Sequence, residues 1–204
     1  MRFVLASHNR GKLREMQQLL APLGAEVVLP ADLGITGEAE ETGRSFAENS
    51  MIKARAVFDA CGLATIADDS GLMVDALDGA PGVYSARFGA PACKTDADRN
   101  ALLLRKLELV PDPERGAQFV CAVTCILPDG TVLTAQGICR GEILRANRGD
   151  NGFGYDPLFY VPQEGMSFAE LPAERKNQIS HRARAFAELK EKLIKYEEER
   201  HAEQ

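Results

Sequence analysis

The sequence contains no apolar run that approaches the length of about 20 residues needed to cross a membrane. It also shows no secretory signal peptide, because residues 1–7, MRFVLAS, have the length of a single strand and lead into a polar loop. Internal repeats and low-complexity linkers are absent as well. These absences exclude a membrane-spanning protein and a repeat array, and they predict a cytoplasmic protein that has no membrane partner.

The cysteines are few, and their spacing does not suggest disulfide bonds. The five cysteines are odd in number, and no two of them have CxxC spacing. Cys121 and Cys125 lie in one strand-like run, where they would be about 13 Å apart, too far for a disulfide. We therefore interpret the cysteines as packing thiols in a reducing compartment.

The composition that remains is typical of a globular domain. Of 204 residues, 45% are hydrophobic and 26% are charged, with a net charge of −6. A chain of this length buries a core without disulfides, and its negative charge disfavours a nucleic-acid polymer as a partner. Basic residues nevertheless gather near positions 10–14, 53–55 and 175–184. They indicate either a small anionic ligand or ordinary solvated helix faces.

Strand and helix patterns alternate in the first half of the chain. Apolar runs predict strands over 2–7, 25–30 and 63–68, and helical spacing predicts a helix over 12–23 and another after Ser45. In the second half, residues 117–144 predict a long hairpin with a turn at 128–130. This mixture predicts an α/β fold with a mixed sheet in one domain over 1–204, with a frayed tail from about residue 197.

The segment SHNRGK, residues 7–12, lies between the first strand and the first helix. A helix N-terminus attracts phosphate, because its N–H groups are unpaired and its dipole end is positive. Ser7 and Asn9 can donate hydrogen bonds, Gly11 allows the backbone to approach closely, and Lys12 adds a positive charge. The segment does not match the pattern GxxxxGK[ST], so a phosphate-binding turn and a polar turn with an Asn cap both stay open.

Acidic residues occur at two places where they could hold a divalent cation. Glu41 precedes the second predicted helix, which carries Lys53, and Asp68 and Asp69 end the third predicted strand. Adjacent strand residues point to opposite faces, so the two aspartates are not expected to form a like-charge pair. Carboxylates without a His/Cys cluster favour magnesium over zinc. The alternatives are a helix-dipole interaction for Glu41 and a structural acidic turn after the strand.

Two later segments, GFGYD (152–156) and ERKNQISHR (174–182), combine aromatic and charged side chains. Ring stacking and directional hydrogen bonds from such groups could hold a flat heterocycle. The alternative is that the Phe153 ring packs in the core and that His181 and Arg182 belong to the first turn of a helix beside Ser180. The groups concerned are Phe153, Tyr155, Asp156, Lys176, His181 and Arg182.

Taken in order, SHNRGK, EETGRSFAENSMIKA, ADDSGL, GAPGVYSARF, NGFGYDP and ISHR resemble the inosine triphosphate pyrophosphatase family. The resemblance runs from residue 3 to about residue 195; Asn151 stands where glycine is common in the family. It implies a two-lobed α/β protein with a long mixed sheet flanked by helices, an active-site cleft between the lobes, and a homodimer. It also implies Mg²⁺-dependent hydrolysis of ITP, dITP and XTP to the monophosphate and pyrophosphate, which cleans the nucleotide pool.

The resemblance further implies a role for each matching residue. Asp69 would accept the proton of the attacking water, and Glu41 and Asp69 would bind Mg²⁺. Whether Asp69 acts directly or through a water on the metal stays open. The implied substrate-binding residues are Ser7, His8, Asn9, Arg10, Gly11, Lys12, Lys53, Ser70, Phe153, Gly154, Tyr155, Asp156, Lys176, His181 and Arg182.

Two other functions stay open at the level of sequence. One is a regulatory module that binds ITP or XTP without turnover, and the other is an enzyme that acts on modified pyrimidine triphosphates. The set of Glu41, Asp69 and Lys12 argues against the first, because binding alone does not need a poised carboxylate.

Overall fold

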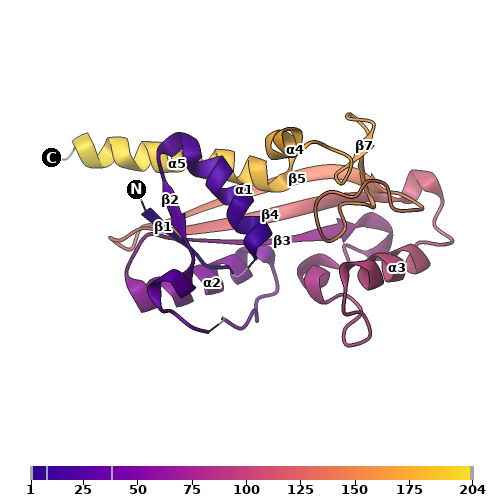
Figure 1. The fold of residues 1–204 in the computed structure, drawn as a ribbon, viewed down its shortest axis with the longest axis horizontal. Helices are drawn as coiled ribbons and strands as arrows, with labels where there is room; N and C mark the ends of the chain where they lie inside the picture. The colour runs from indigo at the N-terminus through magenta and orange to yellow at the C-terminus, as the bar shows by residue number, and fades with distance from the viewer. Residues whose placement is uncertain (1, 8, 38, 203–204) are drawn as a thin grey trace. The chain divides into compact units, whose positions relative to one another are not determined.

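The computed structural model describes residues 2–7, 9–37 and 39–202, and Figure 1 shows its helices and strands. The chain divides into two compact units. Unit 1 comprises Met1–Asp69, Cys121–Gly137 and His181–Gln204, and unit 2 comprises Ser70–Val120 and Ile138–Ser180. The cleft that the resemblance implies between two lobes stays a prediction.

The described residues form strands that belong to one mixed sheet, in the order β2-β1-β3-β4-β5-β6-β7. β1 is parallel to β2 and β3, whereas β6 is antiparallel to β5 and β7. The predicted α/β fold with a mixed sheet and flanking helices is therefore confirmed. The strands and α-helices are β1 (Arg2–Leu5), α1 (Arg10–Leu20), β2 (Glu26–Val28), α2 (Phe46–Cys61), β3 (Thr65–Val74), α3 (Asp96–Lys106), β4 (Gly116–Ile126), β5 (Val132–Ile143), β6 (Phe159–Val161), β7 (Met166–Ser167), α4 (Ala173–Ile179) and α5 (His181–Ala202).

The sheet of unit 1 has helices on both faces. Phe3 and Leu5 of β1 pack in one cluster with Met16 of α1 and Leu189 of α5. The alternate side chains of the strands pack in a second cluster that contains Ala54 of α2. α1 and α5 lie side by side, as Figure 1 shows. Side chains that alternate along a strand of unit 1 thus point either toward α1 and α5 or toward α2.

Unit 2 has a separate core built on aromatic rings. Phe119, Phe159 and Phe168 lie with their ring centroids 4.7 to 5.7 Å apart, a spacing at which aromatic pairs attract one another. Leu103 of α3 is fully buried in the same cluster. These contacts pack α3 against the rest of unit 2.

β3 is longer than the sequence predicts. A strand over 63–68 was expected, with Asp68 and Asp69 at its end, but β3 runs from Thr65 to Val74. Both aspartates and Ser70 therefore lie within a strand, and the interpretation of this segment as a structural acidic turn is wrong. The polar residues continue the strand because side chains from distant segments pair with them, as the next subsection shows.

The C-terminal segment of the chain forms the long helix α5 (His181–Ala202). A frayed tail was expected from about residue 197, but α5 remains helical through Ala202. Lys195 and Glu199 form an ion pair one helical turn apart in this segment, a spacing that supports helices. Residues 197–202 are thus helical in this structure, and fraying of this tail stays a prediction. None of the described helices combines the length and apolar character that a membrane span requires.

Gly137 of β5 allows the start of α5 to approach the strand closely. A Cβ atom at this position would lie 2.0 Å from the carbonyl oxygen of His181 and 2.4 Å from the amide nitrogen of Ala185. We expect Gly137→Ala to lower the free energy of unfolding by about 1–3 kcal/mol, because backbone atoms must move to admit the methyl group. Urea denaturation measures the change. Thr134→Ala, at an exposed position of the same strand, is the control and should change it by less than about 0.5 kcal/mol.

Candidate functional site

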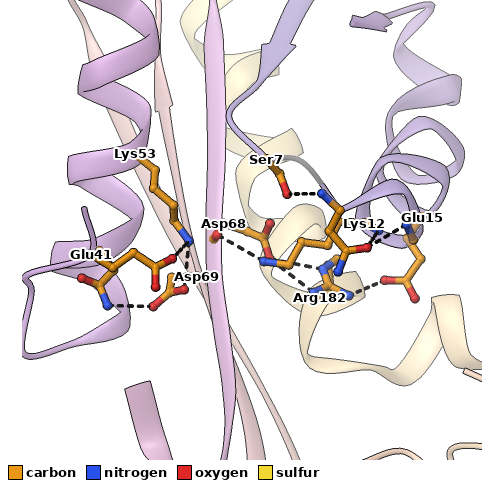
Figure 2. A network of polar contacts seen from close by, with 11 residues as sticks. Ser7, Lys12, Glu15, Glu41, Lys53, Asp68, Asp69 and Arg182 are labelled. Atoms are coloured by element: carbon orange, nitrogen blue, oxygen red, sulfur yellow. Dashed lines mark hydrogen bonds and ion pairs between the residues drawn. The ribbon is translucent and has the colours of Figure 1, made fainter. Parts of the chain in front are cut away.

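Two neighbouring aspartates of β3 point to opposite faces of the sheet in unit 1. Figure 2 shows Asp69 beside Lys53 and Glu41 on one side of the strand, and Asp68 beside Lys12 and Arg182 on the other. Both carboxylates are buried. The prediction that they do not form a like-charge pair is confirmed, and each has its own set of partners.

On the α2 side, one ammonium group lies between two carboxylates. Nζ of Lys53 is 2.9 Å from Oδ1 of Asp69 and 2.9 Å from Oε1 of Glu41. α2 places Lys53 at this position, and the helix begins where the Ser45 side chain accepts a hydrogen bond from the backbone N–H of Glu48. The structure thus brings together three predicted site residues that lie far apart in the sequence.

Asn49 belongs to the same cluster, although the sequence prediction did not include it in the site. Its Nδ2 donates to Oδ2 of Asp69 at 3.2 Å, and its Oδ1 accepts from the backbone N–H of Gly43 at 2.8 Å. The side chain is fully buried and ties the loop that carries Glu41 to the strand that carries Asp69. Its position one helical turn before Lys53 was the available signal, because residues four apart share a helix face.

The electrostatics of this cluster hold Lys53 charged and make Asp69 easier to protonate than usual. Burial raises the pKa of the Asp69 carboxyl above its ordinary value, and the nearby Glu41 adds to this, while Lys53 opposes it. For Lys53, burial lowers the pKa, but the carboxylates of Asp69 and Asp68 outweigh that effect and raise it. A carboxylate with a raised pKa is better suited to accept a proton near neutral pH.

Glu41 and Asp69 fit the requirements of a magnesium ion. Both carboxylates lie at 2.9 Å from the same cationic nitrogen, so that they already face one positive charge. Within the described ranges, no group of three or more His, Cys, Asp or Glu side chains is arranged to hold a metal. Magnesium is commonly bound by one or two carboxylates together with substrate phosphates and water, and this donor set matches that pattern.

On the other face, Asp68 pairs with two cations. Its Oδ2 lies 3.0 Å from Nζ of Lys12 and 3.3 Å from Nη2 of Arg182, and Arg182 also pairs with Glu15. Burial raises the pKa of Asp68, but Lys12 and Arg182 outweigh this and hold it well below its usual range. Arg182, which was predicted to contact the base, is thus held in a buried ion-pair network in unit 1.

The segment 7–12 forms a capped helix start. Oδ1 of Asn9 accepts from the backbone N–H groups of Gly11 at 2.8 Å and Lys12 at 3.2 Å, and Oγ of Ser7 accepts from the N–H of Asn9 at 3.1 Å. The interpretation as a polar turn with an Asn cap is confirmed, and phosphate binding by the same residues stays a prediction. His8 lies outside the described residues, as does the side chain of Arg10.

In unit 2, the segment 152–156 and Lys176 form a second cluster. Oδ2 of Asp156 accepts from Nζ of Lys176 at 2.7 Å and from the backbone N–H of Phe153 at 2.9 Å. Phe153 is 39% exposed as a residue, and Nζ of Lys176 lies 5.1 Å from the centroid of its ring, within cation–π range. Phe153 therefore presents a ring to solvent, as the heterocycle interpretation requires.

Tyr155 does not present its ring. The side chain is buried in the core of unit 2, and its hydroxyl donates to the carbonyl oxygen of Ser85 at 2.8 Å. The prediction that Tyr155 offers an aromatic face is therefore wrong, because the hydrogen bond and the packing turn the ring inward. A substrate contact through the backbone of Tyr155 stays a prediction.

The structure gathers the predicted site residues into two groups. The polar network of β3 lies in unit 1 together with His181, which is buried in the first turn of α5, as the alternative interpretation held. Phe153, Asp156 and Lys176 lie in unit 2, to which the half-buried Ser70 also belongs. That the two groups serve one ligand stays a prediction at this point.

Comparisons with known proteins show which family the chain resembles over nearly its whole length. A sequence model of the Ham1 family matches residues 3–192. A dITP/XTP pyrophosphatase of Desulforamulus reducens is 50% identical over 194 residues, covering 95% of this chain and 96% of the relative. One from Nostoc sp. is 53% identical over 192 residues, covering 93% of each. The Staphylococcus aureus Ham1 structure matches with a TM-score of 0.86 at 39% identity, covering 96% of this chain and 100% of that chain.

Proposed function

The chain belongs to the Ham1 family, and from this premise we propose that it hydrolyses dITP, XTP and ITP to the monophosphate and pyrophosphate. Such an activity removes non-canonical purine nucleotides from the nucleotide pool. The observation that carries the proposal is the half-buried cluster of Glu41, Asp69 and Lys53 in unit 1, where two carboxylates face one positive charge. The substrate class is taken from the relatives, which are named dITP/XTP pyrophosphatases.

The reaction replaces a bridging P–O bond between the α and β phosphates with a bond to the oxygen of water. Asp69 takes the proton that the water loses, and its position is fixed by Asn49 on one oxygen. Mg²⁺, held by Glu41 and Asp69, would supply positive charge for the oxygens on which negative charge develops. Lys53 and Lys12, which are both held by carboxylates of β3, add cationic groups for the phosphates.

Selectivity for the base follows from hydrogen-bond matching. Inosine and xanthine carry a keto oxygen at the position where adenine carries an amino group. A donor such as the ammonium of Lys176 matches the keto oxygen, whereas adenine would bring a second donor against it. A polar mismatch of this kind in a buried site can discriminate by roughly 10⁴-fold. Guanine shares the keto group, so its amino group must be refused by a different contact.

Pyrophosphate release from a panel of nucleotides tests the proposal. The purified protein is incubated with Mg²⁺ and dITP, XTP, ITP, ATP, GTP or modified pyrimidine triphosphates. We expect pyrophosphate from the first three at rates well above those for the others. Tight binding of dITP or XTP without product would instead show a regulatory module. A preference for pyrimidine triphosphates would move the protein to a different substrate class.

Magnesium dependence is a further part of the proposal, with its own test. Glu41→Gln removes one carboxylate and leaves Asp69 as the remaining charged protein ligand of the ion. We therefore expect the Mg²⁺ concentration for half-maximal activity to rise by about tenfold, which corresponds to about 1.4 kcal/mol. Magnesium titrations of pyrophosphate release measure this. Glu40→Gln, at the exposed neighbouring position, is the control. Full activity in the presence of a chelator would contradict the magnesium proposal.

Phe153 provides a test of base stacking. If its exposed ring stacks on the purine, Phe153→Ala should weaken dITP binding by about 1–3 kcal/mol, by analogy with base stacking on aromatic side chains. Calorimetry without Mg²⁺ measures the Kd. Tyr84→Ala removes another exposed aromatic ring of unit 2 (64% exposed) and should leave the Kd unchanged. An unaltered Kd for Phe153→Ala would limit Phe153 to a packing role.

The protein is further proposed to act as a homodimer in the cytoplasm. The resemblance to the pyrophosphatase family supports the dimer, and sedimentation equilibrium tests it. All five cysteines carry free thiols, which agrees with a reducing compartment. The localisation of a tagged protein tests whether the protein acts in the cytoplasm.

A further inference from the structure

Helix α3 holds one residue of the loop 152–156 through both of its backbone polar groups. The N–H of Gly154 donates to Oδ2 of Asp96 at 2.8 Å, and its carbonyl oxygen accepts from Nδ2 of Asn100 at 3.1 Å. Asp96 and Asn100 are four residues apart, so they lie on the same face of the helix. All three residues belong to unit 2. We refer to these two hydrogen bonds as the Gly154 clasp.

Asn100 makes this contact at a site where an apolar residue would be expected. The residue is 4% exposed, and within the described part of the chain its Oδ1 is buried without a hydrogen-bond partner. A buried acceptor left unpaired costs about 1–3 kcal/mol. Leu103, one turn later, lies in the core. The fold therefore accepts an energetic penalty at Asn100 in order to place an amide donor against the carbonyl of Gly154.

Asp96 is not needed to start the helix. Thr95 is the N-cap of α3, and Thr95 and Asp98 form a complete capping box. The Asp96 side chain is half exposed and also pairs with Arg99. Burial raises its pKa, but hydrogen bonds from Arg99 and from Gly154 outweigh this and hold it below the ordinary value. The carboxylate is thus ionised near neutral pH and can accept from Gly154.

The clasp acts on the segment that presents the Phe153 ring. Gly154 has a positive φ of 63° and Gly152 has one of 79°. Glycine adopts positive and negative φ about equally readily, so contacts with neighbouring groups are needed to select one conformation. On the other side of Phe153, its own N–H is bonded to Asp156. Backbone groups on both sides of the exposed ring are therefore fixed before any ligand binds.

We propose that Asp96 and Asn100 are positioning residues that hold Phe153 and Gly154 as a preformed platform for the purine base. The inference rests on the proposed function, because it assigns the base to this segment. A platform ordered in advance strengthens binding, since the ligand does not have to order the loop. The residues act through Gly154, so they contribute to recognition of the base and leave the phosphates to unit 1.

The test compares a ligand that has a base with one that lacks it. Asp96→Ala is expected to weaken dITP binding by about tenfold and to leave the binding of inorganic tripolyphosphate within about twofold. Calorimetry without Mg²⁺ measures both ligands. Asp96→Asn keeps an oxygen that can accept from Gly154, and it should restore dITP binding to within about threefold of the unmodified chain. Arg99→Ala removes the ion pair but not the clasp and serves as the control.

Asn100→Leu provides a second variant that removes the other half of the clasp and fills the buried space. It should weaken dITP binding without affecting tripolyphosphate. If Asn100→Leu does not fold, the variants of the half-exposed Asp96 are sufficient to test the proposal. Equal losses for both ligands, or no loss for dITP in Asp96→Ala, would overturn the proposal.

Amide hydrogen exchange separates this inference from the proposed function. In the absence of nucleotide, Asp96→Ala should speed exchange of the Gly154 amide, whereas Arg99→Ala should not. If the unmodified chain does not bind dITP but this exchange difference is present, the purine site is refuted and the Gly154 clasp is still supported. An unchanged exchange rate would refute the clasp, whatever the nucleotide binding.

Discussion

Asp69→Asn is expected to lower the turnover of dITP by about 10²–10⁴-fold, the range that a general base contributes. The amide keeps the size of the side chain but cannot accept the proton of the attacking water. It also removes the charge that faces Lys53 at 2.9 Å and a proposed ligand of Mg²⁺. Initial rates of pyrophosphate release under saturating dITP measure the effect.

Nucleotide binding separates a chemical role of Asp69 from a structural one. Calorimetry without Mg²⁺ should give a Kd for dITP within a few-fold of the unmodified chain, because the proposed phosphate and base contacts remain. Asp59→Asn, at an exposed position near the end of α2, is the matched control and should leave both quantities unchanged. Normal turnover in Asp69→Asn, or a loss of binding that explains the whole loss of rate, would show that Asp69 is not the base.

Asp68→Ala is expected to lower the free energy of unfolding by about 3–5 kcal/mol, the effect of breaking a buried ion pair. The substitution leaves Lys12 and Arg182 in a buried site, with Glu15 as a carboxylate partner of Arg182. Urea denaturation measures the change. Asp112→Ala breaks an exposed pair with Arg145 and should change the free energy by less than about 1 kcal/mol. Similar values for the two variants would contradict the structural role of Asp68.

The contribution of Asp68 to the free energy of unfolding is also expected to depend on pH. The folded state lowers the pKa of Asp68, so its carboxylate stabilises the fold fully at pH values above the unfolded pKa of about 3.9. As the pH falls below that value, the stabilisation is lost toward the lower, folded pKa. The difference in stability between the unmodified chain and Asp68→Ala should therefore narrow below pH ~4. A difference that stays constant through this range would show that its origin is not the charge.

Part of the site follows from local sequence alone. The alternation of side chains along a strand places Asp68 and Asp69 on opposite faces, and the structure confirms this. The Asn9 cap is also a local feature, because its partners are the N–H groups of Gly11 and Lys12. Spacing within a strand or a helical turn is fixed by backbone geometry, and such features were therefore predictable.

Other features depend on contacts between segments that are distant in the sequence. β3 continues through Asp68 and Asp69 because Lys12, Lys53 and Arg182 compensate their charges, and no local pattern shows that such partners exist. In the same way, the hydrogen bond to Ser85 decides that Tyr155 faces inward, although Phe153, two residues before it, faces solvent.

The sequence by itself determined the α/β class, the alternation of the two aspartates and the family resemblance, since each depends on residue types at fixed spacing. Only the tertiary structure decided which charges neutralise one another, how far β3 extends, and that Asp96 and Asn100 hold Gly154. The physical reason is that a buried polar group is stable only with a partner, and the identity of that partner is set by how distant segments pack.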